Sequence, residues 1–199
     1  WNFYVFTNTT DTNASFVVTT GTNVAFVVFL PPNLSRTRNV DADIDLYVST
    51  DAALTNLDAA VLAATDKSTN RGGTELVFYT NAPLDQVFYI GIKSEDQQAA
   101  EYNLIALSSD RPFDEDDNGN RILHGLPVGI PIPDGSADAP KGALMFAIAT
   151  QPIRVGRVIV TNILSHEDVG DLTGTLDHAG NHVFLYNHTL NFDEFAGTN

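Results

Sequence analysis

Short apolar runs alternate with clusters of turn-forming residues along almost the whole chain. The runs are rich in Val, Phe, Tyr, Ile and Thr, and the clusters between them are rich in Asn, Asp, Gly and Pro. This alternation is typical of many short antiparallel strands. In the first half of the chain it predicts strands at Asn2 to Thr7, Ala14 to Thr19, Asn23 to Leu30, Ile44 to Val48, Thr74 to Thr80, Gln86 to Lys93 and Glu101 to Leu107.

One stretch departs from the strand pattern. Between Asp51 and Ala64 the apolar residues keep a helical spacing, and Thr50 is placed to cap the start of a short helix. Strand signals return in the second half, and they predict strands at Ala143 to Thr150, Ile153 to Leu164, Leu172 to Leu176 and His182 to Asn187.

A boundary between two domains is indicated where the apolar pattern lapses. Residues 110–125 hold a dense run of charged and turn-forming residues, which is typical of a linker. A chain of 199 residues is long enough for two small domains that each bury a core. We therefore expect an all-β protein with two consecutive antiparallel β-sandwich (jelly-roll-like) domains, at residues 1–109 and 126–199, joined by an acidic linker.

Charge and composition exclude several classes of partner. The formal net charge is -15 and only ten Lys and Arg residues are present, so we expect no nucleic-acid partner. The longest apolar run, Val24 to Leu30, is too short to cross a bilayer, and no membrane insertion is expected. No cysteine is present, which excludes disulfides and thiolate zinc sites. The chain starts at Trp1, so we expect any leader peptide to have been removed or to lie outside it.

Asp41, Asp43 and Asp45 occupy alternate positions of a predicted strand. Alternate side chains of a strand share one face, so the three carboxylates are predicted to repel one another. Calcium, which takes several oxygen ligands, would offset that repulsion. The alternative is a solvated strand edge at which one Asp accepts backbone hydrogen bonds from a neighbouring turn.

A second candidate calcium site lies in the predicted linker. Asp114, Asp116 and Asn118, followed by Gly119, match the first half of a calcium-binding loop. The twelfth position of that loop is Gly125, where a bidentate Glu is expected. The loop would therefore need ligands from elsewhere, and the alternative is an acidic flexible hinge.

Two further groups of residues invite a catalytic or metal-binding interpretation and are weaker. Ser165, His166 and Asp168 do not fit a catalytic triad, because neighbouring residues of one strand point to opposite faces or lie too far apart for its chain of hydrogen bonds. His178, His182 and His188 could together meet a metal ion such as zinc or copper. However, His178 and His182 flank a turn signal, so they are expected to be exposed partners across a hairpin. No catalytic residue is predicted in this chain.

The first half of the chain resembles the bacterial pre-peptidase C-terminal (PPC) domain, a small β-sandwich appended to secreted proteases and other exported proteins. The resemblance rests on four segments in order along residues 1–109. They are Asp43-Ile44-Asp45-Leu46-Tyr47-Val48, Gly72-Gly73-Thr74-Glu75, Val87-Phe88-Tyr89-Ile90-Gly91-Ile92 and Glu101-Tyr102-Asn103-Leu104.

The second half is similar to the start of a proprotein-convertase P domain, a jelly-roll-like module. The resemblance is carried by Ile130-Pro131-Ile132-Pro133-Asp134, by Ser165-His166-Glu167-Asp168-Val169-Gly170-Asp171-Leu172 and by Leu176-Asp177-His178-Ala179-Gly180-Asn181. The later, Trp-containing strands of that family have no counterpart before Asn199. The resemblance implies a shortened second domain or a chain that was cut.

Together these features predict a non-catalytic module of a larger secreted or cell-surface protein. We expect it to serve adhesion, matrix contact or domain spacing, with an extracellular protein or glycan as partner. One alternative is the accessory region of an exported subtilisin-like serine endopeptidase whose catalytic domain lies outside this chain. Another is an extracellular filament or lattice subunit, because an unfinished sandwich leaves an open sheet edge for self-association.

Overall fold

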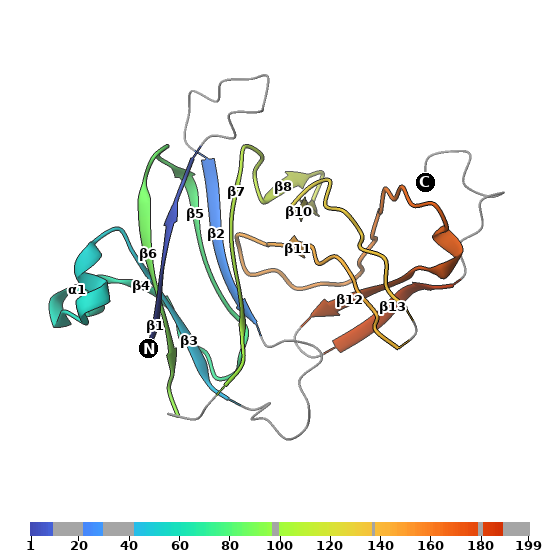
Figure 1. Ribbon diagram of the computed structural model, residues 1–199. Helices are drawn as coiled ribbons and strands as arrows, with labels where there is room; N and C mark the ends of the chain where they lie inside the picture. The colour runs from blue at the N-terminus through green and yellow to red at the C-terminus, as the bar shows by residue number, and fades with distance from the viewer. Residues whose placement is uncertain (10–21, 30–41, 97–99, 137, 179–180, 189–199) are drawn as a thin grey trace. The chain divides into compact units, whose positions relative to one another are not determined.

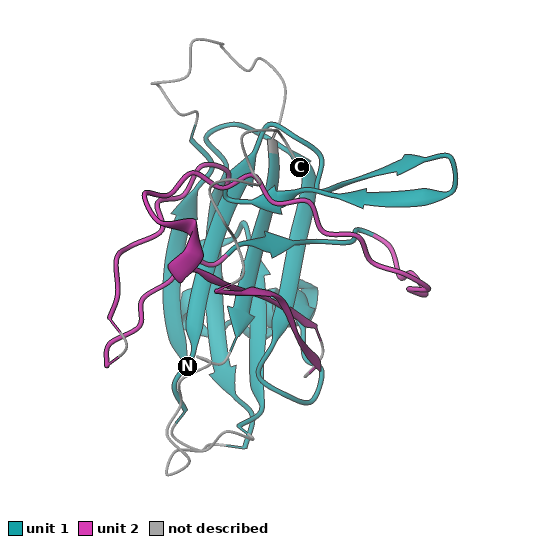
Figure 2. Ribbon diagram, turned by 90° about the vertical axis from the view of Figure 1, so that its right-hand side faces the viewer, with its two compact units in different colours: residues 1–127, 145–150 teal, residues 128–144, 151–199 magenta. Residues whose placement is uncertain are grey.

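A computed structural model of the chain describes residues 1–9, 22–29, 42–96, 100–136, 138–178 and 181–188. Strands hold 46% of the described residues and helices 9%, so the protein is all-β, as predicted. In the described residues no helix has the length and apolar character needed to cross a membrane. The chain divides into unit 1, residues 1–127 and 145–150, and unit 2, residues 128–144 and 151–199 (Figure 2).

Unit 1 contains most of the strands (Figure 1). Its strands are β1 (Asn2–Thr7), β2 (Thr22–Phe29), β3 (Ile44–Ser49), β4 (Asp66–Ser68), β5 (Glu75–Ala82), β6 (Val87–Ser94), β7 (Asn103–Ser109), β8 (Asp114–Asp117), β9 (Asn120–Leu123), β10 (Gly125–Leu126) and β11 (Phe146–Ala147). Six of the seven strands predicted in residues 1–109 are present within about two residues of their expected bounds; the seventh, Ala14 to Thr19, lies outside the described residues.

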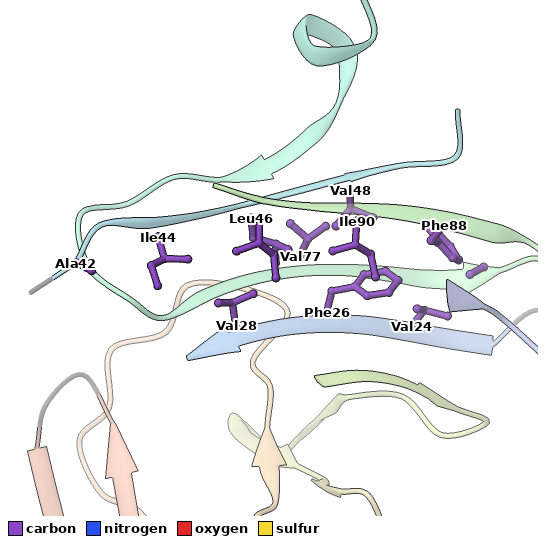
Figure 3. Close-up of a cluster of buried hydrophobic side chains, with 12 residues drawn as sticks. Val24, Phe26, Val28, Ala42, Ile44, Leu46, Val48, Val77, Phe88 and Ile90 are labelled. Atoms are coloured by element: carbon purple, nitrogen blue, oxygen red, sulfur yellow. The ribbon is translucent and has the colours of Figure 1, made fainter. Parts of the chain in front are cut away.

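The two larger sheets of unit 1 have the strand orders β1-β6-β3-β4 and β5-β2-β7. Both share one hydrophobic core, to which β2 contributes Val24, Phe26 and Val28 while β3 and β6 contribute alternate residues such as Leu46 and Ile90 (Figure 3). The core also has aromatic edge contacts, because the Phe26 ring lies 5.5 Å from that of Phe6 at nearly 90°. These residues face inward together because successive side chains of a strand point to opposite faces of the sheet.

The other face of the β5-β2-β7 sheet is buried as well. A second cluster joins Ala25 and Leu107 to Phe113, Leu126 and Ile148, all at most 8% exposed. Strand β2 is therefore covered on both sides, which explains why its sequence is continuously apolar instead of alternating. Phe113 lies within the predicted acidic linker, residues 110–125, and Leu126 follows it directly. These residues instead belong to unit 1, where they form the β8–β9 hairpin and the start of β10.

The predicted helix is present in two pieces. A 3-10 helix, η1 (Ala52–Asn56), is followed by α1 (Ala59–Ala64). The caps are Asp51 and Asp58, whose carboxylates accept hydrogen bonds from backbone N–H groups of the first turns; Thr50 is not the cap. Between the two pieces Leu57 adopts a left-handed conformation at φ 56°, which interrupts the helix.

Unit 2 has less regular structure in its described residues. It contains the short helix η2 (Val169–Asp171) and a hairpin of β12 (Thr173–His178) and β13 (Asn181–Asn187). The hairpin was predicted. The strand predicted at Ile153 to Leu164 was wrong, because residues 152–165 form neither helix nor strand, and only Phe146–Ala147 of the strand predicted at Ala143 to Thr150 is present.

Candidate functional site

Aromatic side chains gather on the outer face of the β1-β6-β3-β4 sheet. Phe3 of β1 and Tyr47 of β3 both stand opposite Gly91 of β6, one on each side. Trp1, two residues before Phe3, stacks on the Phe3 ring with a centroid distance of 5.7 Å and lies 4.8 Å from the Tyr47 ring. We call Trp1, Phe3 and Tyr47 the aromatic cluster.

Gly91 makes this arrangement possible. A Cβ atom at that position would lie 3.0 Å from Cζ3 of Trp1 and 3.3 Å from Cε1 of Phe3, closer than side chains normally approach. The missing side chain thus leaves a hollow in the central strand that the two rings cover. Trp1 remains 42% exposed, so the cluster presents a partly exposed aromatic surface.

Trp1 also lines a cavity of about 250 Å³, whose lining residues Ile44 and Ile92 belong to the core on the other face of the sheet from Phe3 and Tyr47. Ile44 and Ile92, both almost fully buried, are among its lining residues, with Asn2, Ser94 and Tyr102. The Tyr102 hydroxyl accepts a hydrogen bond from the Asn2 amide at 2.7 Å and shares another with the Tyr4 hydroxyl at 2.8 Å. Burial and the Tyr4 hydroxyl raise the pKa of Tyr102 to about 12, so the phenol is neutral at physiological pH. The cavity therefore combines apolar surface with hydrogen-bonding groups.

Asp45 is nearly buried in β3, opposite Lys93 of β6, and its side chain is not solvated as one alternative proposed. Burial, followed by the negative charges of Glu95 and Asp43, raises the pKa of Asp45 to about 6, against the opposing charge of Lys93. Lys93 is itself paired with Glu95. Carboxylates at this end of the sheet thus repel one another, as the sequence predicted.

Asp43 closes a loop. Its Oδ1 accepts a hydrogen bond from the Gly72 N–H at 2.9 Å, and its backbone carbonyl accepts one from Glu95 at 2.8 Å. Gly72 has φ +132°, a conformation that favours glycine. This is the backbone contact to a neighbouring turn that the alternative to calcium, a solvated strand edge, included for one Asp of the Asp41, Asp43 and Asp45 group; Asp41 lies outside the described residues.

Glu75 was missed as a feature of this end of unit 1. The residue is 1% exposed; Ser68 donates a hydrogen bond to Oε2, and Oε1 has no hydrogen-bond partner among the described residues. Burial raises the pKa of Glu75, with Asp43 adding to it and contacts to Ser68 and Asn70 opposing it. Its placement after Gly72-Gly73 was noted only as part of a family resemblance, because a strand pattern gives no sign of a buried carboxylate.

The predicted calcium loop at Asp114, Asp116 and Asn118 is the β8–β9 hairpin, with Asn118 and Gly119 at its turn. Both carboxylate oxygens of Asp114 accept hydrogen bonds from Thr150, at 2.7 and 2.9 Å. The Asn118 amide donates to Asp117 at 2.7 Å. Among the described residues no group of three or more His, Asp or Glu is arranged to hold a metal ion, so calcium at either position stays a prediction.

The histidine-containing segments of unit 2 form local contacts. His166 Nδ1 lies 2.8 Å from the carbonyl oxygen of Asp168, whereas the Asp168 carboxylate accepts a hydrogen bond from the Gly170 N–H. That carboxylate therefore caps η2. His182 pairs with Asp177 across the hairpin, with 2.6 Å between Nδ1 and Oδ1, and Thr173 lies 3.4 Å from His188.

Comparisons with known proteins find no relative for this chain. No family model, no curated protein and no solved structure matches it. The resemblances to PPC and P domains therefore stay predictions.

Proposed function

We propose that the chain is a non-catalytic, secreted or cell-surface β-sandwich module that makes adhesive contact with an extracellular protein or glycan. The observation that carries this proposal is the aromatic cluster of unit 1, whose Trp1 also lines the 250 Å³ cavity. Trp and Tyr dominate binding energy at interfaces because they bury a large area with few rotatable bonds. Held over Gly91, these rings need little ordering when a partner binds.

The surroundings of the aromatic cluster limit the chemical classes of partner that fit this surface. The cavity is large enough for one sugar ring or one apolar side chain of a peptide, with hydrogen bonds to Tyr102, Asn2 or Ser94. The net charge of -15 disfavours polyanionic partners through long-range repulsion. A neutral oligosaccharide or an uncharged or basic protein segment fits these requirements better than an acidic glycan.

Trp1 allows a direct test, because it is the single Trp of the chain. The intact 199-residue chain is titrated with chitohexaose, with maltohexaose and with soluble gelatin, and Trp1 emission is followed. We expect one probe to shift or quench the emission saturably. Tyr102→Phe, which removes a hydroxyl at the cavity, is expected to weaken that binding at least threefold, whereas Tyr186→Phe in unit 2 leaves it unchanged.

Two results count against the proposal. If none of the three probes alters Trp1 emission or is retained by the immobilised chain, this surface is no binding site for these classes. If Tyr102→Phe and Tyr186→Phe weaken binding equally, the contact lies elsewhere on the chain.

A further inference from the structure

Unit 2 carries a strand-type sequence that no strand of the described residues accommodates. In the segment Ile153–Leu164, apolar β-branched residues recur along both alternate sets of positions. In the structure the segment is neither helix nor strand. Its apolar side chains are widely exposed, with Val158 at 57%, Ile159 at 73% and Ile163 at 94%.

The β12–β13 hairpin also exposes apolar side chains. Among the described residues its two strands form a sheet that no third strand joins. Adjacent residues of a strand point to opposite faces, and Val183 and Phe184 are 55% and 58% exposed, so both faces present apolar surface. A lone hairpin is only marginally stable in water and normally needs further strands or a covering layer.

The exposed apolar surface of unit 2 totals nearly one side of a standard interface, and the six exposed apolar residues of Ile153–Leu164 contribute roughly 540 Å² of it. The surface is contributed by Ile153, Val155, Val158, Ile159, Val160, Ile163, Val183, Phe184 and Leu185, which are between 37% and 94% exposed. At roughly 150 Å² for a fully exposed large apolar side chain, these residues offer roughly 750 Å². One partner of a standard protein interface contributes about 800 Å².

We propose that Ile153–Leu164 pairs antiparallel with the same segment of a second copy of the chain, across a two-fold axis at Ile159. The pairing adds a strand at an unpaired backbone and is isologous, so it closes at a dimer. It lies in unit 2 and is independent of the binding surface proposed for unit 1.

The sequence of the segment is self-complementary in this register. With Ile159 opposite its copy, Val158 meets Val160 and Val155 meets Ile163, which are favourable β-branched pairs. Arg157 stands opposite Thr161 and Arg154 opposite Leu164, so no two charges face each other. A centre at Val158 would instead place Gly156 opposite Val160 and Arg157 opposite Ile159.

The charge of the chain also favours this segment over other surfaces for self-association. Two copies with a net charge of -15 repel each other, yet residues 153–164 carry only two arginines and no acidic residue. The acidic charges therefore lie outside the proposed contact, where salt screens them. Dimerisation is expected to strengthen as salt rises from 20 to 300 mM.

Single cysteines test the pairing, because the natural chain has none. Under mild oxidation Ile159→Cys is expected to form a disulfide-linked dimer at least tenfold faster than Val155→Cys. The reason is that two copies of position 155 lie eight residues out of register, about 27 Å apart. The double variant Val155→Cys with Ile163→Cys restores crosslinking, because those positions are opposite each other.

Sedimentation provides the second measurement. We expect the unmodified chain to be dimeric at 100 µM and Ile159→Asp to be monomeric, with unchanged Trp1 emission as evidence that unit 1 is folded. A monomer at 100 µM overturns the proposal. This holds both if the cysteine of Ile159→Cys reacts freely with a thiol reagent and if its own chain shields it. Equal crosslinking at positions 155 and 159, or open-ended assembly beyond the dimer, also overturns it.

Discussion

Unit 1 and unit 2 both contain runs of alternating β-branched and aromatic residues, and the two units place them differently. In unit 1, Val24, Phe26 and Val28 are fully buried between two sheets. In unit 2, the comparable residues Val158, Ile159 and Ile163 are mostly exposed. The same sequence pattern thus leads to a core only where a second layer is supplied within the unit.

The difference separates two consequences of strand patterning. An apolar run shows that a surface must be removed from water, but it does not identify what covers it. In unit 1 the covering residues come from far along the chain, as Ile148 packing near Ala25 illustrates. In unit 2 we propose that they come from another molecule.

The largest expected effect follows from removing a core residue of unit 1. Phe26 is fully buried and its ring contacts those of Phe6, Tyr79 and Phe88, so Phe26→Ala should lower the free energy of unfolding by about 3–5 kcal/mol. Phe184→Ala, at a residue 58% exposed, should change it by about 0.5 kcal/mol or less at a protein concentration that keeps the chain monomeric. Urea unfolding is the measurement. Equal losses would show that unit 2 has a core of its own.

The second-largest expected effect concerns residues 145–150, which belong to unit 1 although residues 128–144 before them belong to unit 2. Asp114→Asn weakens the acceptor of two hydrogen bonds from Thr150, and we expect a loss of about 1–3 kcal/mol at pH 7. Burial raises the pKa of Asp114, but the hydrogen bonds from Thr150 and the charge of Arg121 outweigh burial and hold that pKa below its usual value. The wild-type advantage is therefore present above pH 4 and is lost as pH falls below it. Asp116→Asn, on the exposed part of the same hairpin, is the control. An equal effect of both substitutions would contradict the assigned role of Asp114.

Asp45 should show the opposite sign. Its pKa of about 6 in the folded chain exceeds the ordinary value of 3.8, so the unfolded chain releases this proton first and stability falls as pH rises from about 4 to about 6. Asp45→Asn should therefore stabilise unit 1 by on the order of 1–2 kcal/mol at pH 7.5 and by little at pH 4. Thermal melts at the two pH values measure this. Destabilisation at pH 7.5 would mean that the Asp45 carboxylate is held by favourable contacts.

Calcium gives the smallest expected effect. If a cation relieves the repulsion among Asp43, Asp45 and Glu95, 5 mM calcium should raise the melting temperature relative to excess chelator, by roughly 1 kcal/mol for an ion at several times its Kd. Asp43→Asn should remove the shift, while Asp116→Asn tests whether the hairpin contributes. An unchanged melting temperature in calcium removes the metal from the account of unit 1.

Much of unit 1 could be predicted from the sequence, because its strands follow local rules. The apolar runs between clusters of turn-forming residues located β2, β3 and β6. The acidic stretch after Asp110 was misinterpreted as a linker. Local charge does indicate solvent, whereas the buried Phe113 is the apolar residue that anchors this stretch on the sheet.

The candidate site was harder to predict for a related reason. Asp43 and Asp45 were identified as mutually repelling, and the pKa of Asp45 agrees with this. The aromatic cluster was not predicted from the sequence. Its residues Phe3 and Tyr47 and the neighbouring Gly91 come from three strands, with Trp1 just before the first of them, and only the sheet register brings these positions together. A glycine within an otherwise apolar strand, Tyr89-Ile90-Gly91-Ile92, was the available signal of a close approach.

Hydrogen–deuterium exchange at 1 µM and at 100 µM tests the contrast between the two units most directly. We expect the backbone amides of β2 and β6 to be strongly protected at both concentrations. The amides of residues 153–164 should exchange rapidly at 1 µM and become protected at 100 µM. Protection of residues 153–164 that is equal at both concentrations, or absent at both, would contradict this expectation.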